Sequence, residues 1–117
     1  MEYKYIDLDR LNTNCSGDDS MKKELLNMGI DTICMSSQKI KELLVSQDWH
    51  ILARTLHQLR PVLSYCGVIN YLSDIEKIEK DIINNNYCDP DGFIKDLQSN
   101  LDRTITEINS ILGELLT

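Results

Sequence analysis

The sequence predicts an all-α protein, an antiparallel four-helix bundle with a short N-terminal helical lead-in. Three observations support this prediction. Apolar residues recur at helical spacing over most of the chain, whereas the alternation typical of strands is nearly absent. Turn-forming residues divide the chain into four long amphipathic segments, which can bury their apolar faces only against one another. The length of 117 residues suits one domain over residues 1–117.

The opening part of the chain predicts a short helix and then a long one. The helical lead-in covers about residues 6–14, and the letters CSGDDS that follow are typical of a turn. Asp18 or Asp19 can cap a first long helix over about residues 18–45. Its apolar residues repeat at helical spacing: Leu26, Ile30, Ile33, Ile40, Leu43 and Leu44.

The second long helix, over about residues 48–66, carries the most regular apolar stripe of the chain. Its members step by four, three, four and three residues: Leu52, Leu56, Leu59, Leu63 and Cys66. Gly67 suits the position just after a helix. A third helix is predicted over about residues 68–84 and a fourth over about residues 90–115. The Asp-Pro pair in the loop YCDPDGF is typical of a helix start.

Composition excludes several classes of function. With 12 basic and 19 acidic residues the chain has a formal net charge of −7, which opposes nucleic-acid binding. No apolar run approaches the roughly 20 residues that span a bilayer, so we expect no membrane insertion. The four cysteines are widely spaced and form no CxxC pair: Cys15, Cys34, Cys66 and Cys88. We therefore expect reduced thiols, no metal site and a cytoplasmic location.

His57 stands apart from the apolar stripe of the second long helix. At about 100° per residue it falls roughly 130° from the leucines, so it should face solvent. Its expected neighbours on this surface are Ala53, Arg54, Arg60, Pro61 and Ser64. No Asp or Glu occurs from Trp49 to Ser73. An exposed imidazole between two guanidinium groups is suited to an anion, and arginine best matches phosphoryl oxygens.

The chemistry that fits this arrangement is phosphoryl transfer through histidine. An ordinary imidazole, with a pKa of about 6.5, is partly a neutral nucleophile at neutral pH and can form covalent intermediates. The chain has no Gly-rich phosphate loop and no acidic cluster for Mg²⁺, so we expect neither ATP chemistry nor a cofactor of its own. His50 and His57 lie about 10.5 Å apart along a helix, too far to share a metal ion.

The segment LHQLRPVLSYCG resembles the central motif of histidine-containing phosphotransfer (HPt) domains. That motif is a histidine followed by a basic residue three later, a small residue four later and a glycine ten later: His57, Arg60, Pro61 and Gly67. QDWHILARTLH is similar to the acidic residue and apolar spacing before the histidine. YLSDIEKIEK is similar to the following helix, with a glutamate near Glu79, and YIDLDRLNTNCSGDDSMKKELL resembles the N-terminal docking segment and first long helix. The resemblance covers roughly residues 6–112.

Two positions depart from the family pattern. Arg60 replaces the commoner lysine, which keeps the charge but changes its reach. Pro61 replaces the commoner glycine, brings a ring onto the docking face and removes the amide that would bond the carbonyl of His57. We expect a mild kink there or a carbonyl left to water.

The resemblance implies a phosphoryl carrier of two-component signalling that is not an enzyme. His57 would accept the group on its outer ring nitrogen from a receiver-domain aspartate and pass it to another receiver, including receivers of hybrid histidine kinases. Arg60, and by our own reasoning Arg54, would neutralise phosphoryl oxygens. Mg²⁺ would be held by the receiver, and the carrier would be a monomer. The implied docking surface contains Ala53, Arg54, Gln58, Pro61 and Ser64, with apolar contacts from Leu25 and Met28.

Two other interpretations remain open. Pro61 motivates the first, a non-transferring adaptor that binds a receiver without carrying phosphate. The second is an unrelated helical interaction module, in which the acid-free stretch is a generic interface. A buried His57 would favour the second interpretation.

Overall fold

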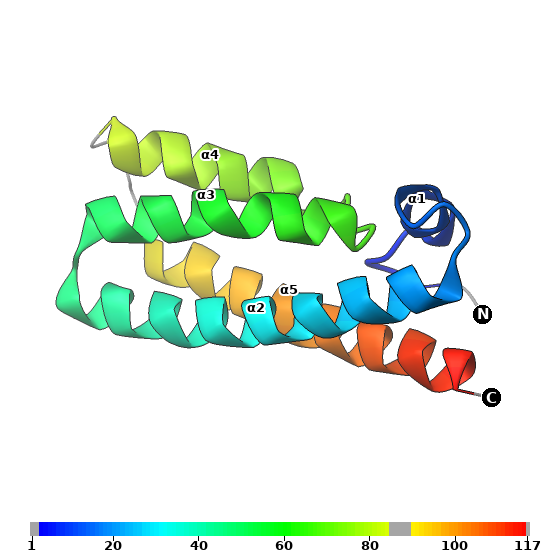
Figure 1. The fold of residues 1–117 in the computed structure, drawn as a ribbon. Coiled ribbons are helices and arrows are strands. Elements are labelled where there is room, and N and C mark those ends of the chain that lie inside the picture. Colours follow the sequence, from blue (N-terminus) through cyan, green and yellow to red (C-terminus); the bar gives the residue numbers. More distant parts are fainter. Residues whose placement is uncertain (1–2, 85–89, 117) are drawn as a thin grey trace.

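The structure, a computed structural model, describes residues 3–84 and 90–116 and confirms the predicted all-α bundle (Figure 1). It contains five helices: α1 (Leu8–Asn14), α2 (Asp19–Ser46), α3 (Trp49–Tyr65), α4 (Leu72–Ile83) and α5 (Pro90–Leu115). Within the described residues, strand-like pairing is limited to an isolated antiparallel bridge between Ile6 and Val68. The four long helices form the bundle, and α1 lies across one end of it.

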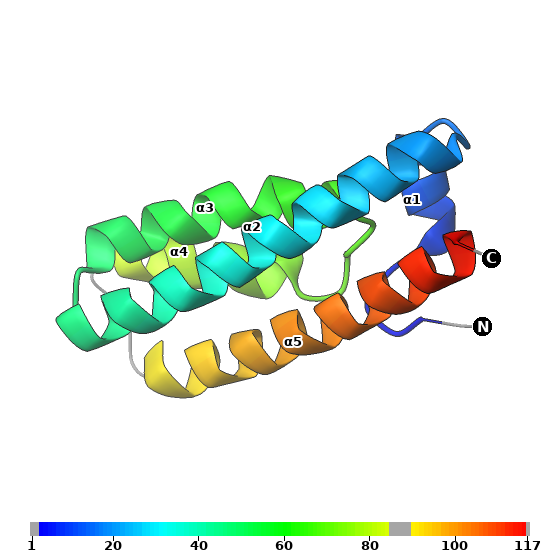
Figure 2. The ribbon, with the colours of Figure 1, turned by 60° about the horizontal axis from the view of Figure 1, so that its bottom comes forward.

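Helix packing gives the bundle an elongated shape of 46 × 21 × 21 Å. Helix α2 packs against both α3 and α5, and α4 packs against α3 on the other side (Figures 1 and 2). The chain enters and leaves at the same end, the one that α1 covers. Among the described helices, none has the length and apolar character needed to cross a membrane.

The core is built from the apolar stripes that the sequence predicts. The predicted stripe, formed by four leucines of α3 and the residue that follows the helix, is fully buried: Leu52, Leu56, Leu59, Leu63 and Cys66. Cys66 packs against Gly29 of α2, where an added Cβ would lie 2.6 Å from its Sγ atom. Burial raises the pKa of the Cys66 thiol to about 11, because the thiolate would lose its hydration. The missing side chain at Gly29 therefore lets α3 approach α2 closely.

Side-chain caps fix the starts of the first two helices. Asp7 accepts a hydrogen bond from the Arg10 amide at the start of α1. At the start of α2, Asp18 accepts from the Ser20 and Met21 amides at 2.8 and 3.3 Å, which confirms Asp18 as the predicted cap. The predicted cap Asp89 lies outside the described residues.

A single carboxylate holds the N-terminal segment against α5. Glu107 accepts hydrogen bonds from the backbone amides of Lys4, Tyr5 and Ile6 at 3.2, 2.9 and 3.1 Å. The Asp7 amide then donates to the carbonyl of Gly67 at 2.9 Å. The segment thus joins α5 to the end of α3 and closes that end of the core.

The prediction that the third long helix begins near residue 68 is wrong, because α4 begins at Leu72. Gly67 has a φ angle of +93° and ends α3 as expected. Val68 then pairs with Ile6 in the bridge and is fully buried, so its backbone is committed to the N-terminal segment instead of a helix. Residues 68–71 consequently form a connection between α3 and α4.

Candidate functional site

His57 projects from the outer side of α3, away from the leucine stripe. Its side chain is 69% exposed, which confirms the direction that the helical wheel predicts. The stripe fixes this orientation, since burying the leucines turns the opposite side of the helix outward. The interpretation that depends on a buried His57 is therefore not supported.

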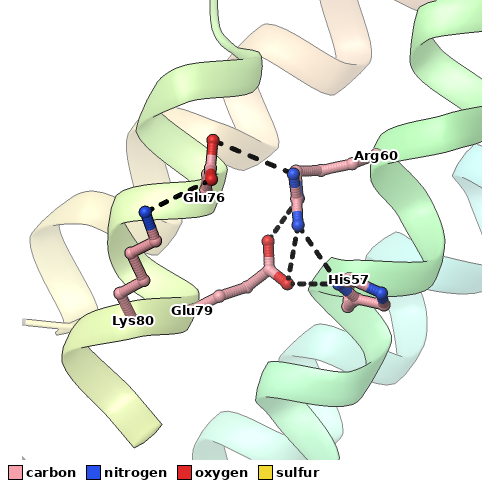
Figure 3. A network of polar contacts seen from close by, with 5 residues as sticks. All are labelled: His57, Arg60, Glu76, Glu79 and Lys80. Atoms are coloured by element: carbon pink, nitrogen blue, oxygen red, sulfur yellow. Dashed lines mark hydrogen bonds and ion pairs between the residues drawn. The ribbon is translucent and has the colours of Figure 1, made fainter. Parts of the chain in front are cut away.

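Glu79 of α4 reaches across to the imidazole and holds one of its two nitrogens (Figure 3). The Nδ1 atom of His57 lies 3.0 Å from Oε1 of Glu79, whose side chain is only 6% exposed. An ionised carboxylate only accepts hydrogen bonds, so the contact with Glu79 favours the tautomer that carries the proton on Nδ1. In the neutral ring the lone pair then resides on Nε2, on the far side of the ring from Glu79. The site presents an oriented nucleophilic nitrogen to solvent.

Arg60 is paired within the same network and balances the charge of Glu79. Its Nε atom forms an ion pair with Oε2 of Glu79, and its Nη2 atom donates to Oε1 at 3.3 Å. Its Nη1 atom lies 3.9 Å from Glu76, which also pairs with Lys80 at 3.3 Å. The Nη2 atom also lies 3.1 Å from Nδ1 of His57, and both nitrogens contact Oε1 of Glu79. A buried carboxylate needs such partners, so Arg60 stabilises Glu79 in place.

The other predicted cation, Arg54, is exposed one turn before His57 on α3. In the part of the chain that the structure describes, no ion pair to Arg54 forms. Its charge is therefore available to an incoming anion, whereas that of Arg60 is largely balanced. Gln58 is also exposed, and Ser64 is half-buried, with its carbonyl accepting a hydrogen bond from Asn14.

The prediction that Ala53 lines the exposed face is wrong, because Ala53 is only 6% exposed. Helix α3 packs against both α2 and α4, which widens its buried face beyond the leucine stripe. Ala53 lies about 60° from Leu56 on the wheel and falls within this wider face. Thr55, on the other flank, is buried in the same way.

Pro61 lies within α3, and the helix continues past it to Tyr65. The ring is exposed on the side of His57 and lines a groove between α3 and α4. Leu25 and Met28 lie elsewhere, in a shallow hollow on α2 that they form with Met21 and Glu24. The carbonyl of Leu25 lies 3.9 Å from Sγ of Cys66, a residue nine positions after His57 and thus about 14 Å further along the helix axis. The structure thus brings Arg60 and Pro61 to His57, whereas Leu25 and Met28 line a different hollow.

Sequence reasoning gave Glu79 and Glu76 no role at the site, although the resemblance pointed to a glutamate near Glu79. A signal was present, because Glu79 falls on the apolar face of its helix between Ile75 and Ile82, and all three are buried. A carboxylate at such a position requires a cationic or hydrogen-bonding partner. The sequence could not show that the partners would be Arg60 and His57 of the preceding helix.

Comparison with known proteins identifies the class of fold. Neither a protein-family model nor a curated protein matches the sequence. Among solved structures, the chain is similar to the crystal structure of the HPT domain from the Hpt sensor hybrid histidine kinase from Shewanella, with a TM-score of 0.82 and 22% identity. The match covers 93% of this chain and 94% of the Shewanella domain. The protein therefore has the helical-bundle fold of an HPt domain.

Proposed function

We propose that the protein is a phosphoryl carrier that receives a phosphoryl group on His57 from an aspartyl phosphate of a receiver domain and relays it to another receiver. The observation that carries this proposal is the exposed imidazole whose Nδ1 atom is held by the buried Glu79, which leaves Nε2 free. The HPt fold supports it, as does the origin of the Shewanella domain in a hybrid histidine kinase.

In the proposed step, the lone pair of Nε2 attacks phosphorus in line with the acyl phosphate. The N–P bond forms while the bond between phosphorus and the aspartyl carboxyl oxygen breaks, and its electron pair leaves on that oxygen to give the free carboxylate. The ring keeps the proton on Nδ1 and becomes positively charged. Glu79, 3.0 Å from Nδ1, stabilises that charge and keeps the ring in the reactive tautomer. Transfer to the next receiver reverses these events.

The two arginines take different parts in this proposal. Arg60 is a positioning residue, since its ion pair holds Glu79 against the imidazole. Arg54 is exposed at the preceding turn, toward which helical side chains lean, and it supplies a cation to the phosphoryl oxygens. The sequence alone assigned neutralisation of the phosphoryl charge mainly to Arg60. In this proposal Arg54 takes most of that role.

The chemistry divides between the two proteins. The receiver supplies Mg²⁺ and the acyl phosphate, and the carrier supplies the nucleophile, so we infer a carrier with no cofactor of its own that is not itself an enzyme. We place it in the cytoplasm as a monomer. The three described cysteines, Cys15, Cys34 and Cys66, are free thiols, which fits a reducing compartment.

The chain contains 2 histidines, which makes the test of this function direct. Purified protein is incubated with Mg²⁺ and a panel of radiolabelled phospho-receiver domains from the genome that encodes it. We expect acid-labile, base-stable label on the wild type, no label on His57→Gln and full label on His50→Gln. Label that persists in His57→Gln would overturn the assignment.

The adaptor is a second candidate because the Pro61 ring is exposed on the side of His57 that a partner would approach. Receiver binding without label on the wild type, from the receivers or from the small donor phosphoramidate, would favour the adaptor. Restored labelling in Pro61→Gly would identify the proline ring as the cause.

A further inference from the structure

A groove of about 510 Å³ runs beside His57, between the second half of α3 and the first half of α4. Its apolar surface comes from Pro61, Ile69 and Leu72, and its polar rim from His57, Arg60 and Glu76. Pro61 is exposed and Ile69 is 44% exposed, so apolar surface is left open to water in a concave site. The volume lies within the range of about 300–1,000 Å³ typical of ligand pockets, which is enough for more than one side chain.

The charges on the rim are already balanced by neighbours. Arg60 pairs with Glu79, and Glu76 lies between Arg60 at 3.9 Å and Lys80 at 3.3 Å. The groove therefore offers no unpaired cation to a small anion. What an occupant gains here is burial of apolar surface, which favours aliphatic or aromatic side chains.

The position of His57 on the rim decides between possible occupants. A protein that brings an aspartyl phosphate to Nε2 must lie over the edge of this groove. No residue from Trp49 to Ser73 is acidic, so α3 and the connection to α4 add no carboxylate that would repel the phosphoryl group. A second copy of the chain seated here would instead cover the imidazole.

We propose that the receiver inserts an apolar ridge, formed by aliphatic side chains next to its phosphoaspartate, into the groove of Pro61, Ile69 and Leu72. This inference rests on the proposed function and names the contact that selects the partner. It is distinct from the hollow on α2 that contains Leu25 and Met28. The groove determines affinity and partner choice, whereas the reactivity of His57 comes from Glu79.

The test compares the same substitution at two exposed isoleucines of the chain. Ile69→Asp places a carboxylate in the groove, and Ile83→Asp places one at the far end of α4, where Ile83 is 64% exposed. For Ile69→Asp we expect the Kd of the receiver to rise by about 10- to 100-fold, and for Ile83→Asp by less than about 3-fold. The transfer rate at saturating receiver and the labelling of His57 by phosphoramidate should match the wild type in both. Ile69→Ser should give a smaller loss without adding charge, and urea denaturation confirms that each variant is folded.

Each result separates the groove from the chemistry. An unchanged Kd in Ile69→Asp overturns the groove contact, even if His57 is labelled. Equal losses in Ile69→Asp and Ile83→Asp overturn it as well, because they indicate general charge repulsion. If the wild type binds receivers but is never labelled, phosphoryl transfer fails while the Kd comparison still tests the groove. Loss of a dimer in Ile69→Asp on size-exclusion chromatography, without loss of receiver binding, assigns the groove to a second copy and overturns the proposal.

Discussion

Replacing Glu79 by glutamine removes the charge that faces His57 and leaves the shape of the side chain nearly unchanged. In the wild type the carboxylate accepts from Nδ1 of His57 at 3.0 Å and pairs with Arg60. The amide of Glu79→Gln can turn its NH₂ group toward Nδ1, which would place the ring proton on Nε2 and block attack.

Two magnitudes follow from these contacts. A hydrogen bond to a charged group contributes about 1.5–3 kcal/mol, so its loss as the ring becomes positive should slow transfer by about 10- to 150-fold. Breaking a fully buried ion pair costs about 3–5 kcal/mol, but the Arg60 side chain is 26% exposed and lies 3.9 Å from Glu76. We therefore expect a loss of only about 1–2 kcal/mol in the free energy of unfolding, which leaves a typical domain folded.

The assay is single-turnover transfer from a radiolabelled phospho-receiver, followed by rapid quench, with urea denaturation run in parallel. Glu76→Gln is the matched control, because Glu76 lies on the same helix and contacts Arg60 but not His57. With the receiver at saturating concentration, so that any change in binding at the groove rim does not matter, its rate should stay within about 3-fold of the wild type. A folded Glu79→Gln protein with the wild-type rate would refute the role of Glu79, and so would an equal loss in Glu76→Gln.

Three further predictions concern stability. Gly29→Ala should destabilise the fold by about 1 kcal/mol, because overpacking against Cys66 exceeds the gain in helix propensity. In a Cys66→Ala background, which removes the clash, the same substitution should stabilise the fold by about 1 kcal/mol. If urea denaturation shows that the effects of the two substitutions simply add, the contact between Gly29 and Cys66 is contradicted. Glu107→Ala should cost about 2 kcal/mol and speed amide exchange in residues 4–6, and unchanged exchange there would exclude the clamp. The Cys66 thiol loses its proton near pH 9.0 in the unfolded chain and only near pH 11 in the folded protein. The free energy of unfolding should therefore fall as pH rises through this window, by up to about 1.4 kcal/mol per pH unit. The fall should be smaller in Cys66→Ala.

The fold was accessible from the sequence because it depends on periodicity. The stripe from Leu52 to Cys66 dictates both the helix and its buried side, and the same stripe sets the direction of His57. The ends of elements were harder to place. Val68 is apolar and fits a helical pattern, but its pairing with Ile6 joins segments far apart in the chain, which local pattern does not show.

The site could be predicted only in part, because periodicity within one helix does not show which residues of another helix it meets. Contacts within one helix follow from spacing, so Arg60 could be placed next to His57. The contact with Glu79 depends on how α3 and α4 face each other, which spacing along one helix does not show. Because of this contact, Arg60 is an ion-paired residue and not the free cation that the sequence suggested. Ala53 shows the related error, since the width of a buried face depends on how many neighbours a helix has.

Both ends of the chain emerge beside α1, whereas His57 lies about 12 Å back from the end of α3 that faces them. A fluorophore, an affinity handle or a sensor-chip linker attached at either end would thus stand clear of the imidazole. When the molecule is immobilised in this way, His57 stays accessible to proteins in solution. The rate at which a partner binds could then be measured without steric interference from the support.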